Sequence, residues 1–182
     1  CHKYGLYLFL DGARLGYGLA APDNDLTLPD IAALCDVFYI GGTKVGALFG
    51  EAVVIKNPEL AQDFRYLIKQ NGGMLAKGRL LGLQFDALFT DGLYQEISAH
   101  AIAMAEKLRE AFTAKGYTYL APNRTNQIFV IVPDAHLAKL SEQFEYSYDQ
   151  RIDATHSCVR FCTGWATKEE NVDALIRCVE KL

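Results

Sequence analysis

Two isolated charged residues, Asp11 and Lys44, lie in stretches of the chain that are otherwise apolar. Asp11 is the only charged residue in residues 4–13, and Lys44 is the only one in residues 37–50. Charged side chains are rarely set among apolar neighbours for solubility alone. A lysine can form a Schiff base with an aldehyde, and a nearby carboxylate keeps a ring nitrogen protonated. The pair therefore indicates a site for pyridoxal 5'-phosphate, an aldehyde cofactor that acts as an electron sink.

Both residues are expected where predicted strands end. Residues 6–10 form an apolar run that stops at Asp11, and residues 37–40 form another that stops at a glycine pair before Lys44. Ligands of open α/β sheets bind outside the carboxyl ends of strands, where both side chains would lie. Taken alone, each residue is more often an ordinary turn or loop residue. Their joint placement is what favours a functional site.

The first half of the chain predicts an α/β sheet, because short apolar runs alternate with helical segments. A long helix is predicted over residues 93–115, ended by Gly116, and a small α+β domain follows it. We expect the domain boundary near residue 91, which divides the chain into 1–91 and 92–182. The further predicted strands are 47–55, 117–120, 127–132, 144–148 and 158–162, and the further predicted helices are 29–34, 59–70, 74–89, 134–142 and 167–181. The last of these helices is predicted to begin with a capping box from Thr167 to Glu170.

Composition excludes several classes of function. The 182 residues have a net charge of −4 and no basic cluster, so nucleic-acid binding is not expected. The five cysteines contain no CxxC pair, and no nearby His or Cys completes a metal set. Reduced thiols favour a cytoplasmic protein, and no apolar run is long enough for a membrane span. The chain opens just before a strand without an initiator Met, so we expect a fragment or a processed product.

Several segments together resemble the threonine aldolase and β-eliminating lyase family of pyridoxal-phosphate enzymes, which has an aspartate aminotransferase-like fold. These segments are residues 10–14, 41–47 and 50–55, with a glycine-rich turn at 69–79 and an Arg-containing strand at 159–161. The resemblance covers essentially the whole chain in the right order. It implies the C-terminal half of such an enzyme: residues 1–91 would belong to the mainly parallel cofactor-binding large domain, and residues 92–182 to the small domain.

The resemblance also implies roles around the cofactor. Lys44 would be the Schiff-base lysine, and Asp11 the partner of the pyridinium nitrogen. Ala13 would pack on the ring face, Arg14 would reach the phenolic oxygen or the substrate carboxylate, and Thr43 would bind the phosphate. The main phosphate-binding cup and the ring-stacking residue would come from the upstream half.

Three further arginine and lysine roles follow from the same resemblance. Arg160 would clamp the substrate carboxylate, since a guanidinium group suits two oxygens. Lys69 and Arg79 would reach the phosphate of a neighbouring subunit in a homodimer or homotetramer.

The expected function is retro-aldol cleavage of β-hydroxy-α-amino acids such as threonine to glycine and an aldehyde. Two alternatives stay open: a lyase that eliminates a β-substituent with the same cofactor, and a catalytically inactive fragment with a binding role. In each enzyme case the partner is a small amino-acid substrate, with no nucleic acid, membrane or metal.

Overall fold

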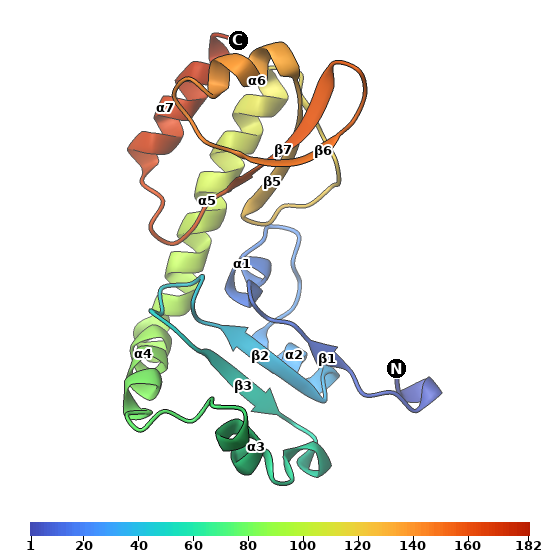
Figure 1. Ribbon diagram of the computed structural model, residues 1–182, viewed down its shortest axis with the longest axis vertical. Helices are drawn as coiled ribbons and strands as arrows, with labels where there is room; N and C mark the ends of the chain where they lie inside the picture. The colour runs from blue at the N-terminus through green and yellow to red at the C-terminus, as the bar shows by residue number, and fades with distance from the viewer. The chain divides into compact units, whose positions relative to one another are not determined.

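The computed structural model describes all residues from 1 to 182, which pack as two compact units (Figure 1). The first unit comprises Cys1–Leu19 and Asn24–Ile97, and the second comprises Ala20–Asp23 and Ser98–Leu182. The long helix α5 (Leu93–Ala114) contributes residues to both units. Each unit has its own sheet, and together they confirm the expected α/β class. The domain boundary near residue 91 stays a prediction.

The first unit is built on a three-stranded sheet in the order β1-β2-β3. Its strands are β1 (Phe9–Leu10), β2 (Val37–Gly41) and β3 (Glu51–Ile55). β1 and β2 run parallel, whereas β3 runs antiparallel to β2. β1 is shorter than the predicted strand 6–10. β3 begins later than the predicted 47–55 because the chain bends at residues 48–49, just before Gly50 with its φ of 90°.

One face of this sheet packs against helix α2 (Leu28–Leu34), which confirms the helix predicted over 29–34. Ile31 and Cys35 pack with Phe38 of β2 to form the core. α2 begins with a true capping box, in which Thr27 and Asp30 bond each other's backbone N–H. The short helix α1 (Leu15–Leu19) follows directly after β1 and its turn.

The two helices predicted over 59–70 and 74–89 are both shorter than expected. The first is divided into a 3-10 turn, Pro58–Ala61, and α3 (Phe64–Gln70), because Asp63 adopts a left-handed φ of 56° between them. The second is α4 (Arg79–Phe89), since residues 73–75 have no regular structure and residues 76–78 form a turn. A further 3-10 turn, Thr90–Gly92, separates α4 from α5.

The second unit is a four-stranded antiparallel sheet in the order β4-β5-β7-β6, with helices packed on its apolar face. Val130, Val159 and Phe161 alternate along its central strands and pack against Leu108 and Phe112 of α5. Its elements are β4 (Thr118–Tyr119), β5 (Gln127–Pro133), α6 (Asp134–Leu140), β6 (Ser147–Arg151), β7 (His156–Cys162) and α7 (Glu169–Glu180).

Two sequence predictions for this unit are wrong in detail. The predicted strand 144–148 is displaced to β6, because Phe144 and Tyr146 pack against the core as part of a loop instead of alternating along a strand. The capping box predicted at the start of the last helix is absent. The Thr167 hydroxyl instead accepts a hydrogen bond from Gly164 N at 2.8 Å, and Lys168 caps the helix without a side-chain bond.

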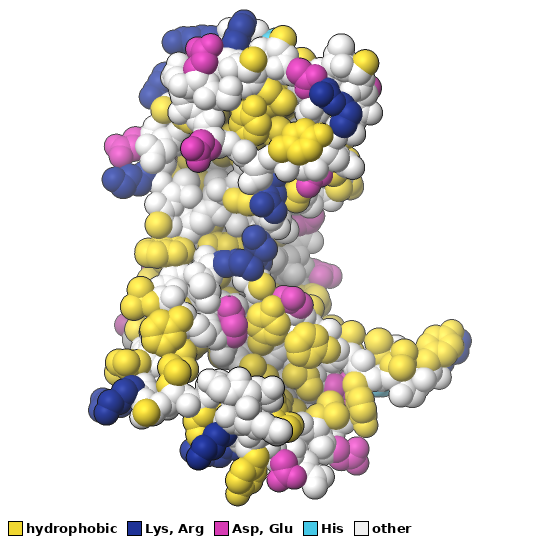
Figure 2. Space-filling model, in the orientation of Figure 1, with side chains coloured by type: hydrophobic (Ala, Val, Ile, Leu, Met, Phe, Trp, Pro, Cys, Tyr) yellow, Lys and Arg dark blue, Asp and Glu magenta, His cyan; other side chains and the backbone are white.

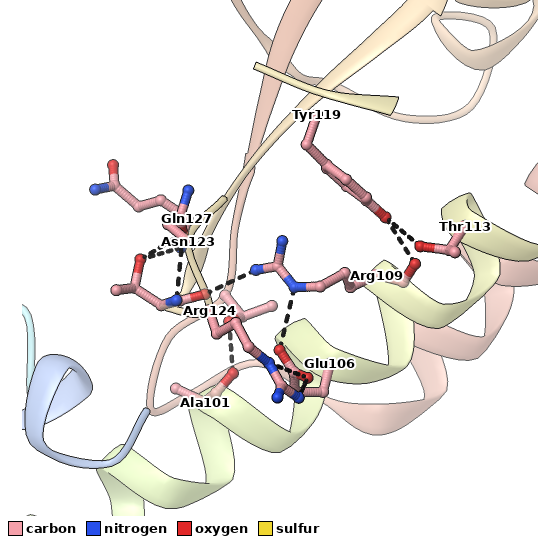
Figure 3. A network of polar contacts seen from close by, with 10 residues as sticks. Ala101, Glu106, Arg109, Thr113, Tyr119, Asn123, Arg124 and Gln127 are labelled. Atoms are coloured by element: carbon pink, nitrogen blue, oxygen red, sulfur yellow. Dashed lines mark hydrogen bonds and ion pairs between the residues drawn. The ribbon is translucent and has the colours of Figure 1, made fainter. Parts of the chain in front are cut away.

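A polar network fixes the loop between β4 and β5 to helix α5 (Figure 3). Glu106 receives hydrogen bonds from Arg109 Nε at 3.1 Å and from Arg124 Nε at 3.2 Å. Burial raises the pKa of Glu106, but the hydrogen bonds and charges of the two arginines outweigh this and hold it below its usual value. The carboxylate therefore stays ionised and ties the loop to the helix.

The structure contains no helix that is both long and apolar enough to cross a membrane. All five cysteines are free, and no group of three or more His, Cys, Asp or Glu side chains is arranged to hold a metal ion.

Candidate functional site

Asp11 and Lys44 lie at the same edge of the first unit's sheet. Asp11 follows β1 directly, and Lys44 lies three residues beyond the end of β2. Because β1 and β2 are parallel, their carboxyl ends meet at one edge. The two side chains are close enough that the charge of Lys44 helps to lower the pKa of Asp11, and both are exposed.

The carboxylate of Asp11 is oriented through one of its oxygens. Oδ1 accepts the backbone N–H of Ala13 at 3.0 Å and also the hydroxyl proton of Tyr39. These hydrogen bonds, with Tyr39 as the largest contributor, lower the pKa of Asp11, and the charges of Lys44 and Arg14 add to the effect. Asp11 is therefore ionised near neutral pH, and Oδ2 has no hydrogen-bond partner in the structure.

A carboxylate fixes the turn that carries Lys44. Glu51, the first residue of β3, accepts the backbone N–H of Gly42 at 2.6 Å and the hydroxyl of Thr43 at 3.2 Å. The hydroxyl of Tyr17 donates to the carbonyl of Lys44. The backbone of the turn is thus held on both sides, while the Lys44 side chain projects from it into solvent.

Close backbone contact joins the two strand ends. The N–H of Gly41 donates to the carbonyl of Gly12 at 2.9 Å. A Cβ atom at Gly12 would lie only 1.6 Å from the Tyr39 carbonyl oxygen, so no other residue fits there. The hydroxyl of Tyr94, on α5, contacts the same junction and donates to Gly41 O at 2.9 Å. Burial raises the pKa of Tyr94 to about 12.

The other residues of the first unit that were predicted to contact the cofactor differ in burial and in their distance from Asp11 and Lys44. Ala13 is half-buried and uses its N–H to orient Asp11. Arg14 is half-buried just before α1, near enough for its charge to act on Asp11. The hydroxyl of Thr43 is turned toward Glu51, a carboxylate, in this structure. Lys69, in the last turn of α3, and Arg79, at the start of α4, are exposed, and no hydrogen bond or ion pair joins either to Asp11 or Lys44.

Arg160 belongs to the second unit, on β7. Its guanidinium makes only long hydrogen bonds, to Gln127 Oε1 at 3.4 Å and to Ser147 Oγ at 3.5 Å, and its buried Nε has no partner. It lines a pocket of about 660 Å³ formed by β7, residues 143–147 and α7. A half-buried arginine with an unpaired donor and no carboxylate partner is available to an anionic ligand.

Three residues that hold the site together were missed by sequence reasoning: Tyr39, Glu51 and Tyr94. Tyr39 is an ordinary strand residue by type, and Tyr94 is one apolar position on a long helix. Glu51 did carry a usable signal, since it is the first charged residue after Lys44. A lone carboxylate at the start of a strand, nine residues from the glycine pair, is suited to accept the backbone N–H groups of that turn.

Comparison with known proteins shows what the chain is similar to. A low specificity L-threonine aldolase from a Pseudomonas species is 31% identical over 179 residues, which cover 96% of this chain and 50% of that protein. The solved structure of threonine aldolase from Leishmania major matches the whole of this chain with a TM-score of 0.97 and 43% identity, over 53% of its own chain. Over nearly its whole length the chain is similar to one half of a threonine aldolase, and a C-terminal fragment of that family fits.

The chain spans about half the length of the relatives that it matches, which fits the half-enzyme expected from its sequence. A Listeria monocytogenes protein named as a candidate L-allo-threonine aldolase shares the fold, with a TM-score of 0.73 and 23% identity over all of this chain and 53% of its own. No family model matches the chain.

Proposed function

We propose that this chain forms part of a pyridoxal-phosphate-dependent lyase, which cleaves β-hydroxy-α-amino acids such as threonine to glycine and an aldehyde. The observation that carries the proposal is the pairing at one sheet edge of an ionised Asp11, with one oxygen unbonded, and the exposed amine of Lys44. Family relatives that are named as threonine aldolases support the choice of reaction.

The residues present fit pyridoxal phosphate. Oδ2 of Asp11 is an unpaired acceptor on a carboxylate whose pKa is lowered, mainly by the Tyr39 hydrogen bond, and it suits a protonated ring nitrogen. The Lys44 amine is exposed on a fixed turn and suits a carbonyl carbon. When bound, the cofactor would supply an electron sink for a carbanion at the substrate Cα.

The remaining cofactor contacts of the proposal belong to Ala13, Arg14 and Thr43. Ala13 would lie against the ring, beside the carboxylate that its N–H orients. Arg14 would reach the phenolic oxygen or the substrate carboxylate. Thr43 would donate to the phosphate only after its hydroxyl turned away from Glu51, and Lys69 and Arg79 would reach the phosphate of a neighbouring subunit.

Arg160 would hold the substrate carboxylate, and its unpaired Nε supports this role. A carboxylate fixed by a guanidinium sets which bond at the substrate Cα stands perpendicular to the cofactor ring. In the proposed reaction this is the Cα–Cβ bond. As it breaks, its electron pair stays on Cα, a base takes the proton of the β-hydroxyl, and the β-carbon leaves as the carbonyl of the aldehyde. Cα then takes up a proton, which gives glycine.

We propose a homodimer or homotetramer for the assembled enzyme. Most of the exposed large hydrophobic side chains belong to the first unit, including Phe9, Leu48 and Val53 (Figure 2). Monomers rarely leave so many exposed together. A cytoplasmic setting for amino-acid metabolism is part of the same proposal, and the five free thiols support it.

Product analysis tests the proposed reaction. The protein is expressed from its whole reading frame, loaded with pyridoxal phosphate, and supplied in turn with threonine, serine and cysteine. We expect acetaldehyde and glycine from threonine, with activity lost in Lys44→Ala and kept in Lys77→Ala, another exposed lysine of the first unit. Pyruvate from serine or cysteine, without aldehyde from threonine, would establish the β-eliminating lyase instead.

A further inference from the structure

The hydroxyl of Tyr39 lies against the proposed ring-nitrogen partner, and neither composition nor the comparisons gives it a role. Phe9 pairs with Val37 and Leu10 with Phe38 in the parallel register of β1 and β2. The next position along this register places Asp11 beside Tyr39, whose hydroxyl donates to Oδ1. The Tyr39 ring is half-buried and lies against Phe9, with ring centroids 6.1 Å apart.

We propose that Tyr39 is a positioning residue, which together with the Ala13 N–H holds Oδ1 of Asp11 so that Oδ2 faces a cationic ring nitrogen. This inference deepens the proposed function and rests on it. It names Tyr39 as the side chain that orients Asp11. The ligand that this orientation would serve is a protonated heteroaromatic ring.

The geometry of the Tyr39 contact restricts the rotation of the Asp11 carboxylate. Both donors use the same oxygen, so the carboxylate can rotate neither toward Ala13 nor toward Tyr39 without breaking the other bond. The close approach at Gly12 fixes the backbone that follows Asp11 against the Tyr39 carbonyl. One oxygen is therefore constrained from two sides, and the other is left to solvent.

The electrostatics of the pair agree with the geometry. The hydrogen bond from Tyr39 is the largest cause that lowers the pKa of Asp11. Reciprocally, that bond raises the pKa of Tyr39, to which the charges of Asp11 and Glu51 add. Tyr39 therefore stays a neutral hydrogen-bond donor, and Asp11 stays an ionised acceptor, across the neutral range.

The test uses Tyr39→Phe in the protein loaded with pyridoxal phosphate that carries ¹⁵N in its ring. The phenylalanine keeps the ring that packs on Phe9 and removes only the donor, and Tyr66→Phe, at an exposed position on α3, is the matched control. Because Tyr39 would act on the cofactor only through Asp11, we expect an affinity for the cofactor that is weaker by about three- to tenfold, less than the loss of a direct hydrogen bond to a charged group. We also expect the ¹⁵N shift of Tyr39→Phe to titrate at lower pH, while Tyr66→Phe matches the unaltered protein.

A cofactor-free measurement completes the design. In Asp11→Asn, the pKa of the Tyr39 hydroxyl should fall, as followed by absorbance titration of the tyrosines, and in Tyr39→Phe the carboxyl pKa of Asp11, followed by NMR, should rise. Borohydride reduction of the cofactor-loaded protein separates the role of Tyr39 from the proposed function. If Lys44 is labelled in both the unaltered protein and Tyr39→Phe, and the ring-nitrogen titration is unchanged in Tyr39→Phe, the role of Tyr39 is overturned and the proposed function stands. If the unaltered protein labels no lysine, both are overturned.

Discussion

The two oxygens of the Asp11 carboxylate have different surroundings. Oδ1 receives two donors, and Oδ2 receives none. Arg160 shows a similar asymmetry, with two long hydrogen bonds on its terminal nitrogens and an unpaired Nε. Incomplete hydrogen bonding of this kind leaves room for a ligand at groups that are otherwise held in place.

Replacement of Arg160 by lysine tests the substrate end of the site. Lysine keeps the positive charge but cannot bind a carboxylate through two parallel bonds, so the two are not equivalent. We expect kcat/KM for threonine to fall about tenfold or more, which corresponds to roughly 1.4 kcal/mol. Arg177→Lys, at an exposed position on α7, is the matched control and should leave the steady-state kinetics unchanged. Equal kinetics for Arg160→Lys would remove Arg160 from the substrate site.

Sequence reasoning succeeded at the residue scale where charge was conspicuous. Asp11 and Lys44 stood out as lone charges among apolar neighbours, and the structure places both at one sheet edge. Tyr39 could not be found in this way, because a tyrosine is a common strand residue and its hydroxyl partner is 28 positions away in the sequence. Long-range hydrogen bonds leave no periodic pattern.

At the scale of elements, the junction of β1 and β2 depends on Gly12. An added methyl group would clash with the Tyr39 carbonyl oxygen, which is backbone and cannot move aside. We expect Gly12→Ala to lower the free energy of unfolding by about 1–3 kcal/mol, measured by urea denaturation. Gly18→Ala, in α1, meets no atom within 4 Å and should be neutral or stabilising. Equal midpoints for the two variants would contradict the close approach.

The Glu106 network predicts a pH-dependent contribution to stability. The pKa of Glu106 lies below its ordinary value of 4.5, despite burial, because of the Arg124 and Arg109 contacts. Its contribution is therefore complete above that value and is lost as the pH falls through the lowered pKa. Glu106→Gln should cost about 1–2 kcal/mol at pH 7 and progressively less in acid.

Glu110→Gln, at an exposed position on the same helix, is the control for this measurement. Urea unfolding followed by circular dichroism between pH 7 and pH 3 compares the two variants. A difference between Glu106→Gln and the unaltered chain that stays constant across this range would show that the carboxylate charge is not what stabilises the loop.

Element existence was easier to predict than element boundaries. The long helix α5 and its end at Gly116, with φ 85°, follow from a strong apolar period and a glycine. The capping box predicted at Thr167 failed because that hydroxyl bonds Gly164 N. A box with the same chemistry formed instead at Thr27 and Asp30. Short polar side chains have several backbone partners within reach, and sequence alone does not select one.

At the scale of the whole molecule, the first unit exposes an apolar face. Phe9 and Val53 are 60% and 49% exposed on the sheet face opposite the α2 core. We expect the 182-residue chain expressed alone to bind a hydrophobic dye and to self-associate in size-exclusion chromatography with light scattering. Phe9→Ser should reduce both effects. Tyr148→Ser, in the second unit, removes an equally exposed aromatic ring and should reduce neither. A monomeric chain without dye binding would contradict this expectation.

The central claim is that Lys44 carries pyridoxal phosphate, and chemical mapping tests it most directly. The protein, expressed from its whole reading frame and incubated with the cofactor, is reduced with borohydride and digested, and the labelled peptide is identified by mass spectrometry. We predict a single phosphopyridoxyl-lysine at residue 44, within the segment from Gly41 to Gly50. A label on any other lysine, or none, would contradict the account.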